Sequence, residues 1–355
     1  MQPEAGEESA PAEIIENAKA NIWPHLEALE HLRGCKVIAY FLDDNAALAD
    51  EQMLHLYEHL RRMGKQDQID LWLSSRGGAT EIPWKIVSLM REFAKRFAVL
   101  IPYRAHSAAT HIALGADEIV MTEMSELGPV DPSRRHPLLP QEETKDGRKI
   151  PVPISVQDLR HVLEFIEREM GGDLTPEAGA TVYTALFDKV HPLAIGALEQ
   201  SWALSRQITT RVLSTHMDPE KEADAIEALA ERLSEHYKSH LYQISRREAH
   251  EMGLKASDAS EEETEAMWQL YVAYSHLQIG GEGEIMGEPA IATRIGHIDS
   301  KVGTTVGLGL AKKSDPTQAV GSRWQSHWFA GPAAAQPGEP VVPQQNGEAG
   351  SPPPQ

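Results

Sequence analysis

Residues 98–132 read AVLIPYRAHSAATHIALGADEIVMTEMSELGPVDP, and a related pattern, IDLWLSSRGG, stands upstream at residues 69–78. Each stretch opens with a short apolar run, IDLWLS at 69–74 and AVLIP at 98–102, with the length and composition of a buried strand. Such runs, when they alternate with helical patterns, are typical of a parallel sheet covered by helices. These residues therefore predict an α/β layered fold.

The same alternation continues on both sides of this stretch. Upstream, VIAYFL at 37–42 predicts a strand and residues 50–63 predict a helix. Further along, the sequence predicts a helix over 83–96, which starts with a proline, then a short helix over 110–115 and a strand, EIVM, at 118–121.

The second half of the chain is mostly helical in pattern, with a different composition near its end. Residues 138–153 have the composition of a long exposed loop, and residues 280–330 are Gly-rich with β-like runs. Helical patterns cover residues 155–170, 176–190, 192–216, 219–236 and 261–277, with a short helix within 237–257 that Gly253 caps. We expect a disordered tail over 1–12, a main domain over 13–257, a helical and β extension over 258–330, and a disordered Pro-rich tail over 331–355.

Composition excludes several classes of protein. The 355 residues include 33 Lys and Arg against 53 Asp and Glu, a formal charge of −20, which argues against a general nucleic-acid binder. The mean hydropathy of −0.38 and the lack of a long apolar run predict no membrane span, and the acidic start is unlike a signal peptide. The single cysteine, Cys35, excludes a disulfide framework and a four-thiolate zinc site, and we interpret it as a buried small hydrophobe. We therefore expect a cytoplasmic protein.

Three polar stretches follow predicted strands, where open α/β sheets build their sites. Gly77 and Gly78 follow the first strand, and paired glycines let the backbone approach a ligand closely. Ser107 lies where a strand turns into a helix, beside free N–H groups, and residues 125–132 read SELGPVDP. Taken singly, these features also fit a tight turn, an ordinary helix N-cap and a plain turn.

Taken together, they resemble the signal peptide peptidase A and Clp-protease superfamily, and more closely the serine dehydrogenase proteinase family of serine peptidases within it. The resemblance rests on the order strand, Gly-Gly, helix, strand, Ser-Ala-Ala-Thr, helix, strand, Leu-Gly-Pro-Val-Asp-Pro. It continues through ALGADEIVM at 113–121, HPLAIGALEQSWALSRQITTRVLSTHM at 191–217 and YKSHLYQISRREAHEMGL at 237–254. It implies a ClpP/crotonase-like spiral of β-β-α units with added helices.

The resemblance also implies site residues. Ser107 matches the nucleophile, and Gly77 and Gly78 match the glycine pair of the oxyanion hole, with the N–H groups of Gly78 and Ala108 as the natural donors. This sequence departs from the family pattern in two places. Ala108 and Ala109 replace the usual glycines after the serine, and Arg76 stands where relatives usually have proline.

The general base is less well defined. In Clp-type relatives a histidine lies in the stretch that matches Gly128–Asp131, which contains none. The resemblance to Ser-Lys relatives points instead to Lys149, with Lys145 and His136 as weaker candidates in the same loop. A lysine base needs a pKa lowered by burial. Asp131 is a candidate to orient a base, and Lys189 and His191 are more remote alternatives.

Two further patterns carry no site in this interpretation. The i, i+4 pairs His55/His59 and His236/His240 have no HExxH motif and no third ligand nearby, so we interpret them as solvated helix histidines rather than a metal site. The glycines of residues 302–313 lack the ending of a phosphate loop.

The sequence thus predicts a serine peptidase that acts on a peptide or protein substrate, without metal or nucleotide cofactor, as a homo-oligomer. Two alternatives stay open: a catalytically silent oligomeric scaffold of the same fold, and a crotonase-like acyl-CoA enzyme.

Overall fold

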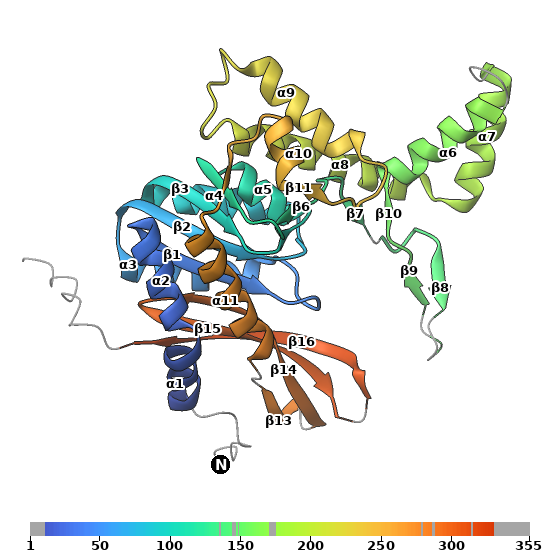
Figure 1. Cartoon of the computed structure of the whole chain (residues 1–355). Coiled ribbons are helices and arrows are strands. Elements are labelled where there is room, and N and C mark those ends of the chain that lie inside the picture. Colours follow the sequence, from blue (N-terminus) through green and yellow to red (C-terminus); the bar gives the residue numbers. More distant parts are fainter. Residues whose placement is uncertain are drawn as a thin grey trace, which may run out of the picture.

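A nine-stranded sheet runs through the part of the protein that the computed structural model describes (Figure 1). The described residues are 11–134, 136–143, 147, 149–169, 175–277, 280–285, 288–313 and 315–329. The predicted tail over 331–355 lies outside them, as does 1–10. Residues 11 and 12, which we expected in the N-terminal tail, instead begin a helix.

The helices are, in chain order, α1 (Pro11–Asn21), α2 (Trp23–Arg33), the 3-10 turn η1 (Asp50–Gln52), α3 (Met53–Met63), α4 (Ile82–Phe93), α5 (Ala108–Leu114), α6 (Val156–Glu169), α7 (Pro176–Lys189), α8 (Pro192–Leu213), α9 (Ala223–Glu231), the π-helical turn η2 (Arg232–His236), α10 (Arg246–Glu251) and α11 (Glu261–His276). The strands are β1 (Lys36–Leu42), β2 (Gln66–Ser74), β3 (Ala94–Ile101), β4 (Arg104–Ala105), β5 (Glu118–Met121), β6 (Glu126–Leu127), β7 (Ser133–Arg134), β8 (Gln141–Glu143), β9 (Lys149–Pro151), β10 (Ile154–Ser155), β11 (Ile244–Ser245), β12 (Ala256–Asp258), β13 (Gly280–Ile285), β14 (Glu288–Ser300), β15 (Gly303–Lys312) and β16 (Asp315–Trp328).

The sheet combines a parallel half with an antiparallel half. Its strand order is β12-β5-β3-β2-β1-β14-β15-β16, and β13 pairs with β14. The strands from β12 to β1 are parallel, whereas β14 joins β1 in antiparallel register, with Tyr40 opposite Ile298. The Gly-rich C-terminal segment therefore extends the same sheet that carries the predicted β-α-β alternation.

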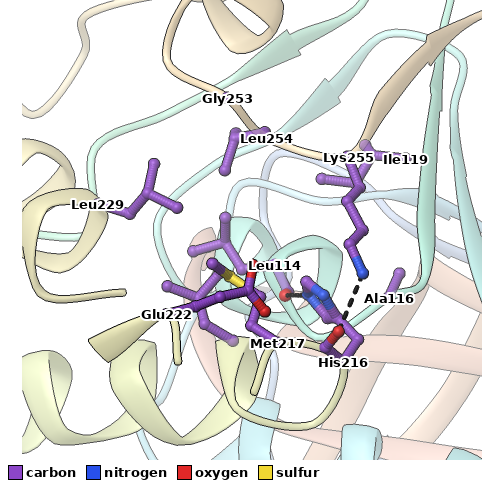
Figure 2. A pocket seen from close by; sticks show the side chains of 11 residues that line it. Leu114, Ala116, Ile119, His216, Met217, Glu222, Leu229, Gly253, Leu254 and Lys255 are labelled. Atoms are coloured by element: carbon purple, nitrogen blue, oxygen red, sulfur yellow. Dashed lines mark hydrogen bonds between the residues drawn. The ribbon is translucent and has the colours of Figure 1, made fainter. Parts of the chain in front are cut away.

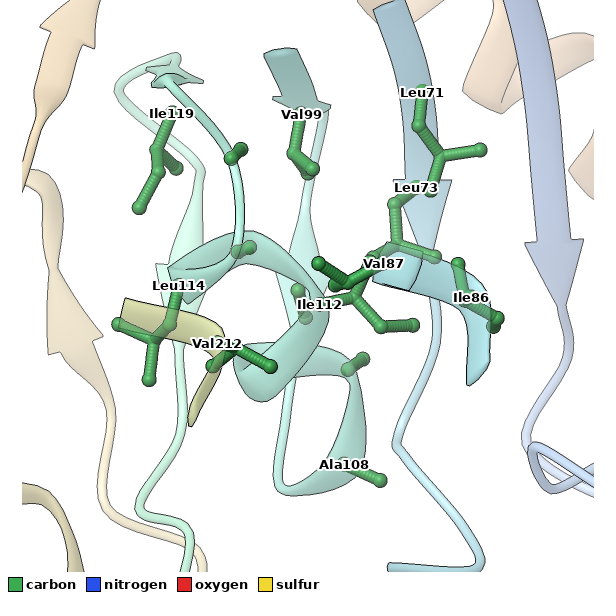
Figure 3. Packing of buried hydrophobic residues seen from close by; sticks show 14 of the residues in the cluster. Leu71, Leu73, Ile86, Val87, Val99, Ala108, Ile112, Leu114, Ile119 and Val212 are labelled. Carbon is green, nitrogen blue, oxygen red and sulfur yellow. The ribbon is translucent and has the colours of Figure 1, made fainter. Parts of the chain in front are cut away.

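Helices cover both faces of the parallel half because successive side chains of a strand point to opposite faces. Figure 3 shows one face, where strand residues such as Leu71, Val99 and Ile119 pack against α4, α5 and α8. On the other face, Phe41 and Trp72 pack against α2 and α11. Each fully buried aliphatic or aromatic side chain contributes roughly 1.5–3 kcal/mol. This two-sided burial explains why the buried parts of these strands are mostly apolar.

Arg33, whose side chain is only 12% exposed, connects elements on the second face of the sheet through ion pairs. Arg33, at the end of α2, binds Asp70 of β2 at 2.6 Å, Glu118 of β5 at 2.8 Å and Glu263 of α11 at 3.0 Å. Asp70 is completely buried, so its charge depends on this partner. One side chain thus joins two helices and two strands.

Four predicted boundaries are corrected. The expected helix over 83–96 ends at Phe93, and β3 begins at Ala94. The expected helix over 110–115 starts earlier, at Ala108. The expected helix over 219–236 begins at Ala223 and becomes the π-helical turn η2 after Glu231. The expected loop over 138–153 contains the small hairpin β8–β9.

Among the described residues, no helix has both the length and the apolar character needed to cross a lipid bilayer.

Candidate active site

The parallel strands β1, β2, β3 and β5 end at one edge of the sheet, since their last residues are paired in register. The loops that follow these strands bring together the three polar stretches singled out in the sequence. Gly77 and Gly78 follow β2, Ser107 comes shortly after β3, and residues 125–132 follow β5. Asp44 follows β1 at the same edge. This is the edge where open α/β sheets bind their ligands.

Ser107 has an unusual backbone conformation. Its φ of +52° and ψ of −118° make it the one non-glycine residue with positive φ in the described part of the chain. Such a conformation costs on the order of 1–3 kcal/mol and persists only where surrounding contacts hold it. Ser107 occupies the N-cap position of α5, but its side chain makes no capping hydrogen bond. The ordinary N-cap interpretation is therefore wrong.

Hydrogen bonds on both sides hold this turn. The backbone N–H of His106 donates to Ser75 at 3.1 Å, and that of Ser75 donates to Arg104 at 3.1 Å. On the other side the Thr110 hydroxyl donates to Ala105 at 2.7 Å and to Gly128 at 2.9 Å. The loop after β2 and the segment after β6 thus hold the turn that contains Ser107.

Gly77 lies directly against this turn. A Cβ atom on Gly77, whose φ is +99°, would lie 2.6 Å from the carbonyl oxygen of His106 and 2.9 Å from Cβ of Ser107. It would also lie 3.0 Å from the amide nitrogen of Ala108. Only glycine fits here, because the opposing atoms are mostly backbone.

Gly78 lies opposite Leu48 in an isolated parallel β-bridge. Leu48 donates its N–H to the Gly77 carbonyl and accepts from Ala79 N–H, both at 2.9 Å. Because backbone groups alternate in direction along an extended chain, the N–H of Gly78 points away from Leu48. The N–H of Gly77, in contrast, donates to the Ser75 hydroxyl at 3.0 Å. Gly78 is therefore the glycine of the pair with an amide left for a ligand.

Ala108 supplies a second amide beside Ser107. As the first residue of α5, its N–H has no acceptor within the helix. The close approach of Gly77 to Ala108 places the two loops within reach of one small group. The arrangement suits an oxygen that carries negative charge.

Lys149 lies in the short hairpin β8–β9, opposite Glu143, with an exposed side chain. Figure 1 shows this hairpin projecting from the body, away from α5. The structure therefore does not bring Lys149 to Ser107, and an exposed lysine lacks the burial that would lower its pKa.

The other sequence candidates for a base lie elsewhere too. His136 is half-buried, and its Nδ1 accepts from the Leu138 amide at 3.2 Å. Lys189 is exposed beside Asp188, and His191 caps the N-terminus of α8. Lys145 lies outside the described residues. The structure describes no contact between these described side chains and Ser107.

A histidine that the sequence interpretation set aside contacts Asp131 instead. Nδ1 of His240 lies 3.0 Å from Oδ1 of Asp131, whose side chain is only 7% exposed. The hydrogen bond with Asp131 and the charge of that carboxylate raise the pKa of His240, although burial opposes them. Its charge in turn lowers the pKa of His106, so the imidazole lies in the electrostatic neighbourhood of the residue before Ser107.

The backbone connects this pair to the turn that contains Ser107. Asp131 lies three residues beyond Gly128, where an added Cβ would lie 3.1 Å from Cβ of His106. The Val130 amide donates to Leu233 of η2 at 3.0 Å, and His240 follows in the turn after η2. No hydrogen bond between His240 and the Ser107 hydroxyl is present in the described structure. Catalytic hydrogen bonds are often long before substrate binds.

Two predicted histidine pairs need correction. His59 is fully buried and bonded to Ser300 at 2.8 Å and to Thr305 at 3.0 Å, so it is a structural residue. His240 lies in a turn on Asp131 rather than on a solvated helix face. Asp131 was already a candidate from the sequence, but no local pattern indicates its contact with a histidine 109 residues away along the chain.

His106, the neighbour of Ser107, stays neutral. Burial, followed by the charges of Arg104 and Arg76, lowers the pKa of His106 to about 4. Its Nε2 lies 2.9 Å from Oε1 of Glu126. Cys35 is half-buried, and burial together with Asp70 raises the pKa of its thiol to about 12, which leaves it protonated.

A separate pocket lies at the opposite end of α5 from Ser107 (Figure 2). It encloses about 70 Å³ and is lined mainly by apolar side chains, among them Leu114, Leu213 and Leu254. Its polar wall is fixed, since His216 bonds to the Leu114 carbonyl at 2.8 Å and Lys255 donates to the His216 carbonyl at 2.9 Å. These groups already have partners within the chain.

The fold and this edge of the sheet define a class: an α/β protein with a strained serine at a strand–helix turn, beside a glycine pair. Residues 48–141, which contain the serine and both glycines, match the family of ClpP-like SDH-type serine proteinases. The family resemblance expected from the sequence is thereby confirmed.

Two relatives are uncharacterized proteins of Methanocaldococcus jannaschii. One is 24% identical over 210 residues, which span 53% of this chain and 71% of that protein. The other is 37% identical over 73 residues, 21% of this chain and 26% of that protein.

Among solved structures, two mutants of the 1510-N membrane-bound stomatin-specific protease are similar. The match to the first covers 64% of this chain and 78% of that chain, with 13% identity and a TM-score of 0.32. The second is in complex with a substrate peptide, and its match covers 60% of this chain and 69% of that chain, with 15% identity and a TM-score of 0.32. A probable enoyl-CoA hydratase/isomerase from Mycobacterium abscessus covers 54% of this chain and 88% of its own, with 9% identity and a TM-score of 0.21. Scores this low do not establish a common fold, so the family match rests on residues 48–141.

Proposed function

We propose that this protein is a serine peptidase in which Ser107 attacks the carbonyl of a peptide bond. The strained backbone of Ser107, which lies against Gly77 and directly precedes Ala108, carries this proposal. A strained turn presents a side chain away from the helix, which is where a nucleophile has to stand. The two amides would stabilise the oxyanion of the tetrahedral intermediate.

We further propose that His240 is the general base and that Asp131 orients it. With Nδ1 on Asp131, the imidazole has Nε2 available to take the proton of the Ser107 hydroxyl. It would return that proton to the amine leaving group, and a water molecule would then release the acyl group by the same route. Apart from the substrate and this water molecule, the steps use only groups of this chain.

The family match supports a peptide or protein substrate and hydrolase chemistry. Lys149 remains the alternative base that the sequence predicted. A silent scaffold and an acyl-CoA enzyme are the competing functions, and both predict that Ser107 is not an activated nucleophile.

A fluorophosphonate probe tests the assignment, because it labels an activated serine whatever the substrate is. We expect labelling of the full chain, its complete loss in Ser107→Ala, and a loss of about 10²-fold or more in His240→Gln. His236→Gln changes a nearby exposed histidine and serves as the matched control. Labelling that persists in Ser107→Ala contradicts the nucleophile, whereas loss in Lys149→Ala with full labelling of His240→Gln replaces His240 by Lys149.

A further inference from the structure

Two arginines beside the candidate active site share one carboxylate. Arg76 binds Asp44 through two hydrogen bonds of 3.0 Å each, in the bidentate geometry that guanidinium groups form with carboxylates. Arg104 donates to the same carboxylate. The two arginines differ in exposure: the side chain of Arg76 is 49% exposed and that of Arg104 only 11%.

Both arginines stand next to the reacting groups. Arg76 immediately precedes Gly77, and Arg104 lies three residues before Ser107. Their charges act on this site, since after burial they are the main cause of the lowered pKa of His106. The two guanidinium groups therefore act electrostatically on the residue that directly precedes Ser107.

Arg76 is free to exchange its partner at little cost. Its ion pair with Asp44 is exposed on both sides, and such pairs contribute little because water screens them. If Arg76 turned to another carboxylate, Arg104 would keep Asp44 paired. The other nearby carboxylate, Glu126, lies 2.9 Å from His106 and is largely buried, so its described contact is with the imidazole.

We propose that Arg76 binds a carboxylate of the substrate, so that the site prefers peptides with an acidic side chain or a free C-terminus near the scissile bond. The inference rests on the proposed peptidase function and adds a specificity-determining residue to it. Because Arg76 is adjacent to Gly77, its guanidinium reaches only substrate groups close to the bond that Ser107 attacks.

Binding to the inactive full chain tests this without relying on cleavage. Four fluorescently labelled peptides of one length are titrated against Ser107→Ala by fluorescence anisotropy: a Glu-rich peptide and its Gln counterpart, each with a free and an amidated C-terminus. We expect the preferred carboxylate to strengthen binding about tenfold, which corresponds to about 1.4 kcal/mol. The four arms show whether the carboxylate is that of a side chain or of the C-terminus.

The variants locate the effect. In the Ser107→Ala background, Arg76→Gln removes the preference and Arg76→Glu reverses it. Arg61→Gln makes the same change in net charge but at an exposed ion pair on α3, so it keeps the preference. Equal affinity for all four peptides, no binding to any of them, or the same loss in Arg61→Gln overturns the inference. Fluorophosphonate labelling of Ser107 decides the peptidase function separately.

Discussion

At the scale of single residues, the site depends on positions where one atom more would not fit. Gly77 has no Cβ and therefore fits directly against Ser107. This contact and the hydrogen bonds of the turn keep the backbone of Ser107 at its positive φ. The chemistry of the site is therefore set by backbone geometry as much as by side chains.

We predict that Gly77→Ala lowers fluorophosphonate labelling of Ser107 by about 10²-fold or more, the loss seen when an oxyanion donor is removed. The new methyl group would lie 2.6 Å from a backbone carbonyl, so the turn must move. Gly196→Ala is the control, because that helical glycine has open space around it. Unchanged labelling of Gly77→Ala would contradict the tight contact.

A second prediction concerns pH. A base has to be neutral, so labelling should fall as the pH drops through the raised pKa of His240. Asp131→Asn removes the charge that raises this pKa, so the acidic limb should move to lower pH while the plateau falls by up to about 10⁴-fold. A pH profile of the labelling rate for both proteins measures the two effects. An acidic limb that does not move would show that Asp131 does not act on the base.

The same sign applies to stability. A histidine whose pKa is raised on folding stabilises the protein below its unfolded pKa, and this contribution disappears as the pH rises through the folded value. The pair of His240 and Asp131 therefore stabilises the fold on the acidic side, where the proposed base is protonated and inactive.

At the scale of elements, the tie made by Arg33 holds the second face of the sheet. We predict that Arg33→Leu lowers the free energy of unfolding by about 3–5 kcal/mol, because Asp70 is left buried without its partner. Arg61→Leu, which removes an exposed pair with Glu58, should change it by less than about 1 kcal/mol. Urea unfolding of the two variants measures the difference. Similar losses in both would contradict the special role of Arg33.

The elements also show what could be predicted from the sequence. The strands at 37–42, 69–74 and 118–121 could be predicted because burial on both faces makes them mostly apolar. The position of Ser107 at the start of a helix could also be predicted, because the change from a strand pattern to a helix pattern is local in the sequence. The antiparallel pairing of β14 with β1 could not be, because no local pattern specifies a partner so far away. The contact of His240 with Asp131 could not be predicted for the same reason.

At the scale of the whole molecule, the proposed site lies at the edge of the sheet where the parallel strands end, and the sequence predicts a homo-oligomer. Figure 1 shows α6 and α7 extending from the body. Phe165 and Phe187 on these helices are about half exposed, an amount of apolar surface that favours association.

We predict that the protein forms a homo-oligomer larger than a dimer, as closed symmetric assemblies of one chain are common. Light scattering at micromolar concentration measures the mass, and the double variant Phe165→Ser with Phe187→Ser should shift it to smaller species. A monomeric mass for the unmodified chain would contradict the prediction.

The antiparallel pairing of β1 with β14 has a consequence for synthesis of the protein. β1 is translated early, and its apolar edge stays unpaired until residues 288–300 have left the ribosome. An unpaired apolar edge recruits strands from other chains, so the nascent protein passes through a stage at which it aggregates easily. We therefore expect a segment far from Ser107 in the sequence to influence how much folded protein a cell obtains, so that damage there appears as low yield before it appears as low activity.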